Sequence, residues 1–391
     1  MSKYFRHFFR SQRSAAFTLI TALAVAAAVF MSPAAFADDD HSKANNNAYV
    51  PNNNGTLSVI DTKTNTVIDT IPGGFNHPFC ATVSPNGKLL YVCSEDNSIK
   101  VVDTATNTIA TSISLPGAIG FIGNEGAGPN VAFSRHGERA YVITSGGGNN
   151  STLYTINTET STVVSSTSFG GTFLLAVAVS PNGDNIYLAT EAPVLSQSGI
   201  LVVDADGDAA TTTIAPGHLV FDLALSRNGD RLYASDVSGL IGGQSGVLVV
   251  DTDTSSVVTT VPLPNNVFVT GLALTPDGRH LYAADFTLTN PANSTVTVID
   301  TRDNSVDTTI SAPGMTFTAI AASRKGHKML AVNSVLSLTA NSTVAVIDTR
   351  TNTIDDSITV ERFPISIATQ PPSSRRDGDD DDDRDHGDHD H

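Results

Sequence analysis

The sequence lacks the short motifs that mark several classes of enzyme. Its two cysteines, Cys80 and Cys93, are too far apart in the sequence for a C-x-x-C redox pair or a C-x-x-C-H motif for covalent haem. A G-x-S-x-G nucleophile elbow and an H-E-x-x-H zinc motif are also missing. These absences remove the commonest signatures of redox, esterase and metalloprotease chemistry and favour a protein without catalytic activity.

Charged residues are scarce, and most of them are acidic. They make up 16% of the chain, with 22 Lys and Arg against 39 Asp and Glu, for a net charge of −17. We expect such a chain to repel nucleic acid and anionic membrane surfaces. Cations and basic partners are the more plausible ligands.

The chain has one long apolar run, at its N-terminus. Residues 1–13 carry four basic residues and no acid, residues 15–31 are apolar, and Ala35-Phe36-Ala37 stands before three aspartates. This order predicts a secretory signal peptide, residues 1–37, cleaved after Ala37. The alternative is an uncleaved signal anchor, although the run is shorter than the roughly 20 residues of a typical span. We expect an exported protein, periplasmic or extracellular, that does not insert into the membrane after cleavage.

Two phrases repeat along the rest of the chain. The first is typified by Ser58-Val59-Ile60-Asp61-Thr62, and the second by Ala81-Thr82-Val83-Ser84-Pro85-Asn86-Gly87. The Asp of the first phrase recurs at intervals of 42 to 54 residues, at Asp61, Asp103, Asp204, Asp251, Asp300 and Asp348, with Asn157 in its place once. Short alternating strands at this period predict an all-β fold, a seven-bladed β-propeller of four-stranded antiparallel blades.

The two ends of the repeat region complement each other. Residues 48–50 form a second strand (b) with no first strand (a) before it, and residues 364–368 form an a strand with no b strand after it. Pairing the two in one blade closes the ring and removes two exposed sheet edges. We therefore expect a propeller over residues 48–370, a polar disordered lead over 38–47 and a disordered tail over 371–391.

The pattern resembles the YVTN-type β-propeller repeat family over nearly all of residues 48–370. The segments Ser58–Thr70 and Val101–Thr108 match its Ser-Val-Ile-Asp-Thr phrase best, and Tyr49-Val50-Pro51-Asn52 comes close to its tetrapeptide. The resemblance implies the propeller fold and a place among exported binding, surface-layer and periplasmic propellers. Similar propellers also include lactonases. The chain has no Trp, which disfavours the quinone-cofactor propellers.

Propeller topology indicates which face to inspect. The a–b and c–d turns share one face and are short and alike in every blade. The b–c and d–a loops share the other face, and we expect long b–c loops at 190–199, 235–246, 285–294 and 333–342 and a long d–a loop at 116–129. Variable loops on a rigid scaffold commonly carry function, although neutral drift in loop length is the alternative.

Acids, histidines and phenylalanines mark this variable face. The candidate ligand-binding residues are Glu191, Asp222, Asp236, Asp285, His77, His218, Phe79 and Phe221. Converging carboxylates could hold a divalent cation such as Ca²⁺, and phenylalanines at the start of the a strands could ring the mouth of the channel. The alternatives are solvated loop acids and inter-blade packing of the rings.

Two further features involve metal ligands and sulfur. The tail offers His386, Asp388, His389 and His391 to Zn²⁺, Ni²⁺ or Cu²⁺, unless it is a solubilising acidic tail. A hairpin centred between Asn86 and Gly87 places Cys80 opposite Cys93 and permits a disulfide in an exported protein. A one-residue bulge at Gly87 would put the two cysteines out of register and leave them free.

Two functional hypotheses remain. The first is an exported, non-catalytic binding or scaffold propeller, acting as a monomer, whose b–c and d–a loops hold a protein, a peptide or a small molecule. The second is a lactonase-type hydrolase with an acid or metal site at the channel mouth. No cofactor is implied beyond a divalent cation, Ca²⁺ or Zn²⁺.

Overall fold

A computed structural model describes residues 46–115, 130–146, 150–205, 210–264, 267–287, 290–335 and 340–372. The predicted signal peptide, most of the polar lead, the d–a loop at 116–129 and the tail ligands His386, Asp388, His389 and His391 lie outside these residues. Within the described ranges, no helix is long and apolar enough to span a membrane.

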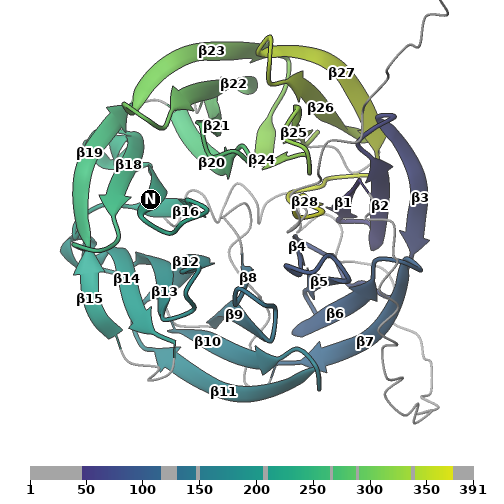
Figure 1. Cartoon of the computed structure of the whole chain (residues 1–391), viewed down its shortest axis with the longest axis horizontal. Helices are drawn as coiled ribbons and strands as arrows, with labels where there is room; N and C mark the ends of the chain where they lie inside the picture. Colours follow the sequence, from purple (N-terminus) through teal and green to yellow (C-terminus); the bar gives the residue numbers. More distant parts are fainter. Residues whose placement is uncertain are drawn as a thin grey trace, which may run out of the picture. The chain divides into compact units, whose positions relative to one another are not determined.

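The described strands form seven four-stranded antiparallel sheets arranged as the blades of a ring (Figure 1). Within every blade, the four strands lie side by side from the centre of the ring to its rim, and they are the strands a, b, c and d in that order. In that order, blade 1 holds β28 (Ala368–Thr369), β1 (Asn47–Asn52), β2 (Thr56–Asp61) and β3 (Thr66–Pro72). Blade 2 holds β4 (Cys80–Val83), β5 (Leu89–Ser94), β6 (Ser98–Asp103) and β7 (Thr108–Ser114). Blade 3 holds β8 (Val131–Phe133), β9 (Arg139–Gly146), β10 (Asn150–Asn157) and β11 (Thr162–Phe169).

The remaining four blades follow the same order. Blade 4 holds β12 (Phe173–Val179), β13 (Asn185–Glu191), β14 (Gly199–Asp204) and β15 (Ala210–Ile214). Blade 5 holds β16 (Val220–Leu225), β17 (Arg231–Asp236), β18 (Gly246–Asp251) and β19 (Ser256–Pro262). Blade 6 holds β20 (Val267–Leu274), β21 (His280–Thr287), β22 (Asn290–Asp300) and β23 (Ser305–Pro313). Blade 7 holds β24 (Phe317–Ala322), β25 (Lys328–Asn333), β26 (Ser342–Asp348) and β27 (Thr353–Val360).

The ring closes as the complementary ends predict. β28 pairs with β1 through Ala48↔Thr369 and Tyr49↔Ala368, and an isolated bridge joins Asn52 to Pro364. In Figure 1 the yellow C-terminal strand lies beside the purple N-terminal one. The prediction of a ring closed by the C-terminal strand is therefore confirmed, although regular pairing is confined to the end of the 364–368 segment and the residue after it.

The repeated phrases build turns that hold one another. In the c–d turns, Asp103 Oδ1 accepts the amides of Ala105 and Thr106, both at 2.9 Å, and Asn107 takes the left-handed conformation with φ 54°. The Thr after the Asp donates to the Gly carbonyl of the a–b turn in the same blade. These bonds run from Thr104 to Gly87, Thr252 to Gly229, Thr301 to Gly278 and Thr349 to Gly326. The repeated phrases therefore hydrogen-bond the c–d turn to the a–b turn of the same blade.

The core lies between blades. A Tyr opens the repeated stretch of strand b in six blades, and each of these rings is almost fully buried: Tyr49, Tyr91, Tyr141, Tyr187, Tyr233 and Tyr282. Tyr282 reaches across to the next blade, where its hydroxyl donates to Asn352 Oδ1 at 2.7 Å. Alternating side chains of each strand thus fill the space on both sides of the blade.

The two cysteines face each other in the β4–β5 hairpin. The register pairs Cys80 with Cys93 directly, with Cα atoms 5.0 Å apart, and their sulfur atoms form a disulfide. The bulge at Gly87 that would separate them does not occur, since the pairing continues unbroken to Val83↔Leu90. Both residues are buried, so the bridge lies inside the inter-blade core.

Thiol titration of the exported protein, denatured without reductant, is expected to find no free thiol, and two after reduction. The Cys80→Ala/Cys93→Ala variant should lose at most about 3 kcal/mol of unfolding free energy, because the bridge closes a short loop. Two reactive thiols in the unreduced protein would show that the bridge does not form.

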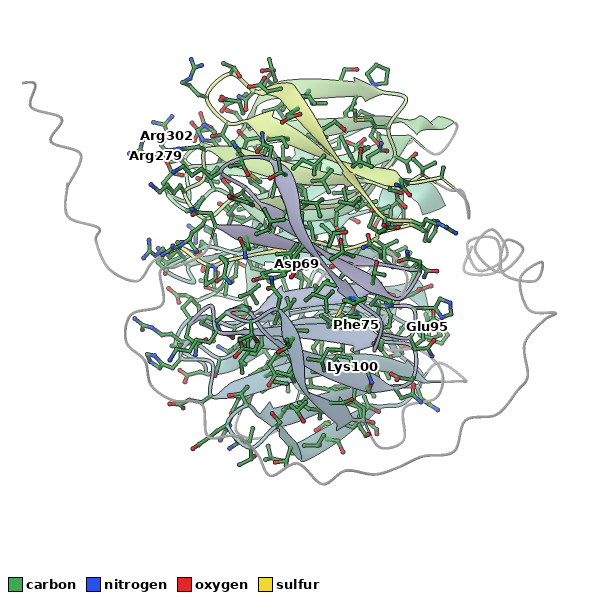
Figure 2. The ribbon with its side chains drawn as sticks, turned by 90° about the vertical axis from the view of Figure 1, so that its right-hand side faces the viewer. Asp69, Phe75, Glu95, Lys100, Arg279 and Arg302 are labelled. Atoms are coloured by element: carbon green, nitrogen blue, oxygen red, sulfur yellow. A yellow bond between two sulfur atoms is a disulfide. The ribbon has the colours of Figure 1, made fainter. Side chains whose placement is uncertain are left out.

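The loops and turns separate onto two faces. Figure 2 shows Phe75 and Glu95, from a d–a and a b–c loop, on one side of the ring, and Arg279 and Arg302, from an a–b and a c–d turn, on the other. We call these the loop face and the turn face. The long b–c loops of blades 4 and 5 each contain a short 3-10 helix, Leu195–Gln197 and Ser238–Ile241. The loop expected at 285–294 is largely strand, because β21 and β22 extend to Thr287 and from Asn290.

Candidate functional site

A ring of buried polar residues underlies the loop face. Each blade places a polar side chain at the end of strand b, at the fourth position of the stretch that Tyr-Val-x-x typifies. These residues are Asn52, Ser94, Thr144, Thr190, Asp236, Asp285 and Asn333, and all are buried. The tetrapeptide is recognisable in the sequence, and aligning its fourth residue across the blades is the signal that could have predicted the ring.

Most members of this ring fasten strand b to strand c where the b–c loop begins. Asn52 donates to Ser58 Oγ at 2.9 Å, Thr190 donates to the carbonyl of Gly199 at 3.1 Å, and Asn333 donates to Thr343 Oγ1 at 3.0 Å. Buried polar groups require such partners. In these three blades, the base of the b–c loop is therefore fixed to the blade beneath it.

Asp236 holds two loops at once. Its Oδ2 lies 2.6 Å from His218 Nδ1 in the d–a loop, while its Oδ1 accepts both the amide (3.0 Å) and the hydroxyl of Ser238 in the b–c loop. Ser238 Oγ in turn accepts the amide of Leu219 at 3.0 Å. Asp236 is 1% exposed and His218 is 42% exposed. The carboxylate orients the ring and leaves Nε2 as the nitrogen that a ligand can reach.

A similar pair lies at the junction of blades 1 and 2. His77 Nδ1 lies 3.5 Å from Glu95 Oε2, and the amide of Glu95 donates to the carbonyl of Asn76 at 2.8 Å. His77 and His218, proposed separately as ligand residues, thus each pair with an acid at the end of strand b: Glu95 just after β5, and Asp236 as the last residue of β17. The two pairs lie on blades 2 and 5, with at least two blades between them, and do not form one site (Figure 1).

The candidate acids do not meet in one cluster. Asp236 and Asp285 occupy the same position in blades 5 and 6, whereas Glu191 stands one residue further on in blade 4, after Thr190. Among the described residues, the group of three that could hold a metal ion lies on the turn face instead, at His280, Asp300 and Asp307. Asp300 there already accepts Nε and Nη2 of Arg302, and these bonds lower its pKa to about 2.

Asp222 is an inter-blade carboxylate inside the ring. Its Oδ1 accepts the amide of Leu223 at 2.7 Å, and its Oδ2 accepts the amide of Leu272 in blade 6, also at 2.7 Å. It is 5% exposed, and burial raises its pKa to about 7 despite the two amide donors. Asp222 thus lies away from solvent and joins blades 5 and 6.

The phenylalanines of the a strands pack between blades. Phe79, Phe268 and Phe317 are buried, and Phe221 is half-buried, with its ring centroid 4.6 Å from that of Phe268 in an edge-to-face contact. Such a contact joins blade 5 to blade 6. Phe79 and Phe221 therefore contribute chiefly to packing in this structure.

Comparison with known proteins agrees with the fold. The family model "WD domain, G-beta repeat" matches residues 66–103, which run from β3 through β6. No curated protein matches the sequence significantly.

Two solved structures share the architecture at low sequence identity. "Dihydro-heme d1 dehydrogenase NirN in complex with DHE" is 14% identical, with a TM-score of 0.54, over 84% of this chain and 75% of its own. Hydrazine synthase from Kuenenia stuttgartiensis is 17% identical, with a TM-score of 0.59, over 77% of this chain and 92% of its own. At these identities the likeness extends to the fold alone. The chain is a β-propeller repeat protein with seven blades.

Proposed function

We propose that this chain is an exported, non-catalytic binding propeller that holds a ligand or protein partner on its loop face, and that it is of the YVTN type. The basic and apolar N-terminal segment supports export, and a disulfide in the ring suits an oxidising compartment. The turn face repeats one design in successive blades, while the loop face differs from blade to blade.

The observation that carries this proposal is the double anchorage at Asp236. One buried carboxylate fixes the d–a loop through His218 and the b–c loop through Ser238. Loops held in this way lose little conformational entropy when a partner binds. The neighbouring b–c loop of blade 4 is fastened in a related way, since Ser198 Oγ accepts the amide of Ala192 at 2.9 Å.

Replacing both loops of blades 4 and 5 is expected to abolish partner capture. Residues 191–198 and 237–245 would each be exchanged for the short blade 2 turn Glu95-Asp96-Asn97, which spans the same strand ends. Proteins and small molecules captured from the exported fraction of the native organism, identified by mass spectrometry, should fall by about tenfold or more. An Arg279→Ala/Arg302→Ala variant alters the turn face and should capture as the wild type does. Loss of capture in that control, with retention in the loop variant, would contradict the proposal.

A lactonase-type hydrolase is the second candidate. The observation favouring it is the oriented His218–Asp236 pair, since a histidine held by a buried carboxylate suits general-base work. Turnover of γ- and δ-lactones by the wild type that disappears in His218→Gln would favour the hydrolase over the binding protein.

A further inference from the structure

Three side chains that can bind a metal ion meet on the turn face of blade 6. They come from three neighbouring strands: His280 from β21, Asp300 from β22 and Asp307 from β23. One donor atom of each lies within 4.8 Å of the other two, and His280 Nε2 lies 3.3 Å from Asp307 Oδ2. Two ligands of a tetrahedral Zn²⁺ with bonds of about 2.0–2.1 Å are about 3.3–3.4 Å apart. The imidazole and the carboxylate therefore already have the spacing of two ligands on one ion.

The three side chains are open to an ion from solvent. Those of His280 and Asp307 are each 38% exposed, and that of Asp300 is 9% exposed. Two carboxylates balance the charge of a dication, and an imidazole nitrogen suits Zn²⁺, whereas Ca²⁺ and Mg²⁺ prefer oxygen ligands. Three protein ligands also leave a position on the ion for water.

The backbone of blade 6 holds these residues in place. The ladder pairs His280 directly with Asp300. Asp307 is the bulged residue of β23, where the pairing with β22 passes from Val306 to Thr308. A bulge re-aims a side chain out of the regular alternation of a strand. The three ligands thus stand on strands rather than on a mobile loop, which reduces the cost of bringing them together.

The other six blades do not supply this combination at the same three positions. The place of His280, opposite the repeated Asp or Asn, is taken by Asn47, Leu89, Arg139, Asn185, Arg231 and Lys328. The bulged place of Asp307 is taken by Ile68, Ala110, Val164, Thr211, Val258 and Asp355. Blade 6 therefore departs from the repeat twice at one spot, and both changes add a metal-binding side chain.

Blade 5 shows that a cation fits at this spot. Arg231 stands in the place of His280, and its Nη1 lies 2.6 Å from Oδ2 of Asp251, the equivalent of Asp300. In blade 6 the charge comes from Arg302 of the c–d turn instead, whose Nε donates to both oxygens of Asp300 at 3.1 Å. The side chain of Arg302 is 80% exposed on the turn face (Figure 2). Ion pairs of such exposed side chains are weak, so a dication can displace this guanidinium.

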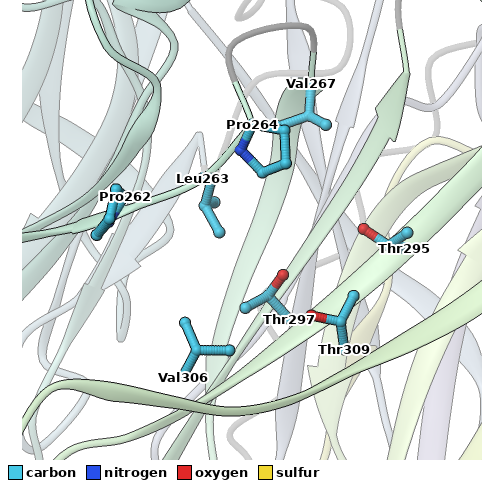
Figure 3. Close-up of a pocket in the computed structure, with 8 residues that line it drawn as sticks. All are labelled: Pro262, Leu263, Pro264, Val267, Thr295, Thr297, Val306 and Thr309. Carbon is cyan, nitrogen blue, oxygen red and sulfur yellow. The ribbon is translucent and has the colours of Figure 1, made fainter.

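The cavity between blades 5 and 6 does not offer a competing set of ligands. Its volume is about 350 Å³, and Val306, which precedes Asp307, lines it together with Thr297 and Thr309 (Figure 3). The lining residues that the structure describes carry no carboxylate, imidazole or thiol. On blade 6, the three side chains of the turn face are therefore the better ligands.

We propose that His280, Asp300 and Asp307 bind a divalent transition-metal ion, with Zn²⁺ as the expected ion, and that Arg302 leaves Asp300 as the ion enters. The ion would join strands b, c and d of blade 6 and keep one position for water or for a donor atom of another molecule. The site lies on the turn face. It is therefore separate from the loop face and does not depend on the function proposed there.

Calorimetric titration of the full exported chain with Zn²⁺ tests the site, and His280→Asn is the principal variant. Tail residues such as His386 are present in both proteins, so the difference between the two titrations isolates blade 6. The wild type should bind one more Zn²⁺ per chain than His280→Asn does. Zn²⁺ should also raise its melting temperature further, because a bound ion stabilises the folded state. His136→Asn, which changes an exposed histidine in the a–b turn of blade 3, should behave as the wild type does.

Further variants distinguish ligation from the general charge of the face. Asp307→Asn should weaken Zn²⁺ binding by about tenfold or more, at least what the loss of an outer-shell partner costs, whereas Asp355→Asn at the equivalent place in blade 7 should not. Asp307→His exchanges one Zn²⁺ ligand for another and should retain the site. Arg302→Ala should tighten binding, because Asp300 no longer has to release a guanidinium. Melting curves without metal report whether each variant folds.

The same measurements can overturn the proposal. Equal Zn²⁺ stoichiometry in the wild type and His280→Asn would do so, as would the absence of a wild-type site tighter than about 1 mM. Equal weakening by Asp307→Asn and Asp355→Asn would show that the ion responds to the acidity of the face and not to three ligands. Weaker binding by Arg302→Ala would refute the displacement of the guanidinium.

Discussion

Deleting residues 363–391 is expected to lower the melting temperature by about 10 °C or more, since the loss of several kcal/mol shifts Tm by a few degrees each. Deleting only residues 373–391 should leave the melting temperature nearly unchanged. The first deletion removes β28 and exposes the edges of β1 and of the neighbouring blades. The second removes residues beyond the last contacts described for the ring.

The effect is expected to be large because the closing segment contacts three blades. Within blade 1, the amide of Gln370 donates to the carbonyl of Asn47 at 3.0 Å. Toward blade 2, Gln370 Nε2 donates to the carbonyl of Gly87 at 3.1 Å, and Ser366 Oγ accepts the amide of Ala81 at 3.2 Å. Toward blade 7, the carbonyl of Pro371 accepts Nε of Arg324 at 3.1 Å.

Gln370 and Pro371 take the place that a Ser-Pro pair holds in other blades. A Cβ added to Gly137, Gly229 or Gly326 would meet the Pro of the preceding blade, and one added to Gly87 would meet Gln370 and Pro371. Differential scanning calorimetry of the two truncations and the full chain measures the effect. Equal melting temperatures for both truncations would refute closure by this segment.

The fold could be predicted because the repeat carries it in every blade. The period and the turn residues are local features, and each turn has a mechanism that acts within a few residues. The unmatched end strands predict the long-range closure because the repeat leaves one partner strand missing at each end. The pairing of Cys80 with Cys93 could be predicted from the position of the turn, because both residues lie in one hairpin. Sequence reasoning succeeded where the partner residues are separated by a single turn, and at the ring closure, where one unmatched strand remained at each end of the repeat region.

The contents of the candidate site depended on contacts between blades and were predictable only in part. His218 and Asp236 were each visible as loop residues, but their pairing requires the d–a loop to fold over strand b of the next blade. The blade 6 loop was predicted too long because the Thr and Asn content of residues 287–295 reads equally as loop or strand.

Asp222 also shows that sequence reasoning does not reveal contacts between blades. The comparison uses one equivalent position of the repeat in all seven blades. Four residues before the Ser, Thr or Gln that opens the a–b turn, the blades carry Ser366, Cys80, Asn130, Ala176, Asp222, Gly271 and Ala319. Asp222 is the one acid, and its oddness is visible in the sequence. Its partner, the amide of Leu272 in the next blade, is visible only in the ring.

Replacing Asp222 by Ala is expected to destabilise the propeller by about 2–4 kcal/mol, because two buried backbone amides lose their acceptor. These are the amides of Leu223 and Leu272. Asp222→Ser should lose less, since Ser366 at the equivalent place in blade 1 accepts the corresponding amide of Ala81 through its hydroxyl. Chemical denaturation of the three proteins at one pH measures the order.

The same substitution should flatten the pH dependence of stability. Burial raises the pKa of Asp222 from 3.8 to about 7, so between these values the native state keeps a proton that the unfolded chain has released. The unfolding free energy therefore falls as pH rises through this window. Burial also raises the pKa of Asp285, to about 6, which adds a decrease of the same sign at lower pH.

The effects of Asp222 and Asp285 on the pH dependence of stability can be distinguished between pH 6 and pH 7. Between pH 6 and pH 7, Asp222→Ser should lose stability less steeply than the wild type, whereas below pH 6 both proteins keep the decrease that Asp285 contributes. Asp253→Ser, which removes an exposed acid from blade 5, controls for net charge and should follow the wild type. Denaturation curves at pH 4.5, 6 and 7.5 bracket the window set by these pKa values. A slope in Asp222→Ser identical to that of the wild type would mean that Asp222 is ionised throughout and that its two amide bonds outweigh its burial.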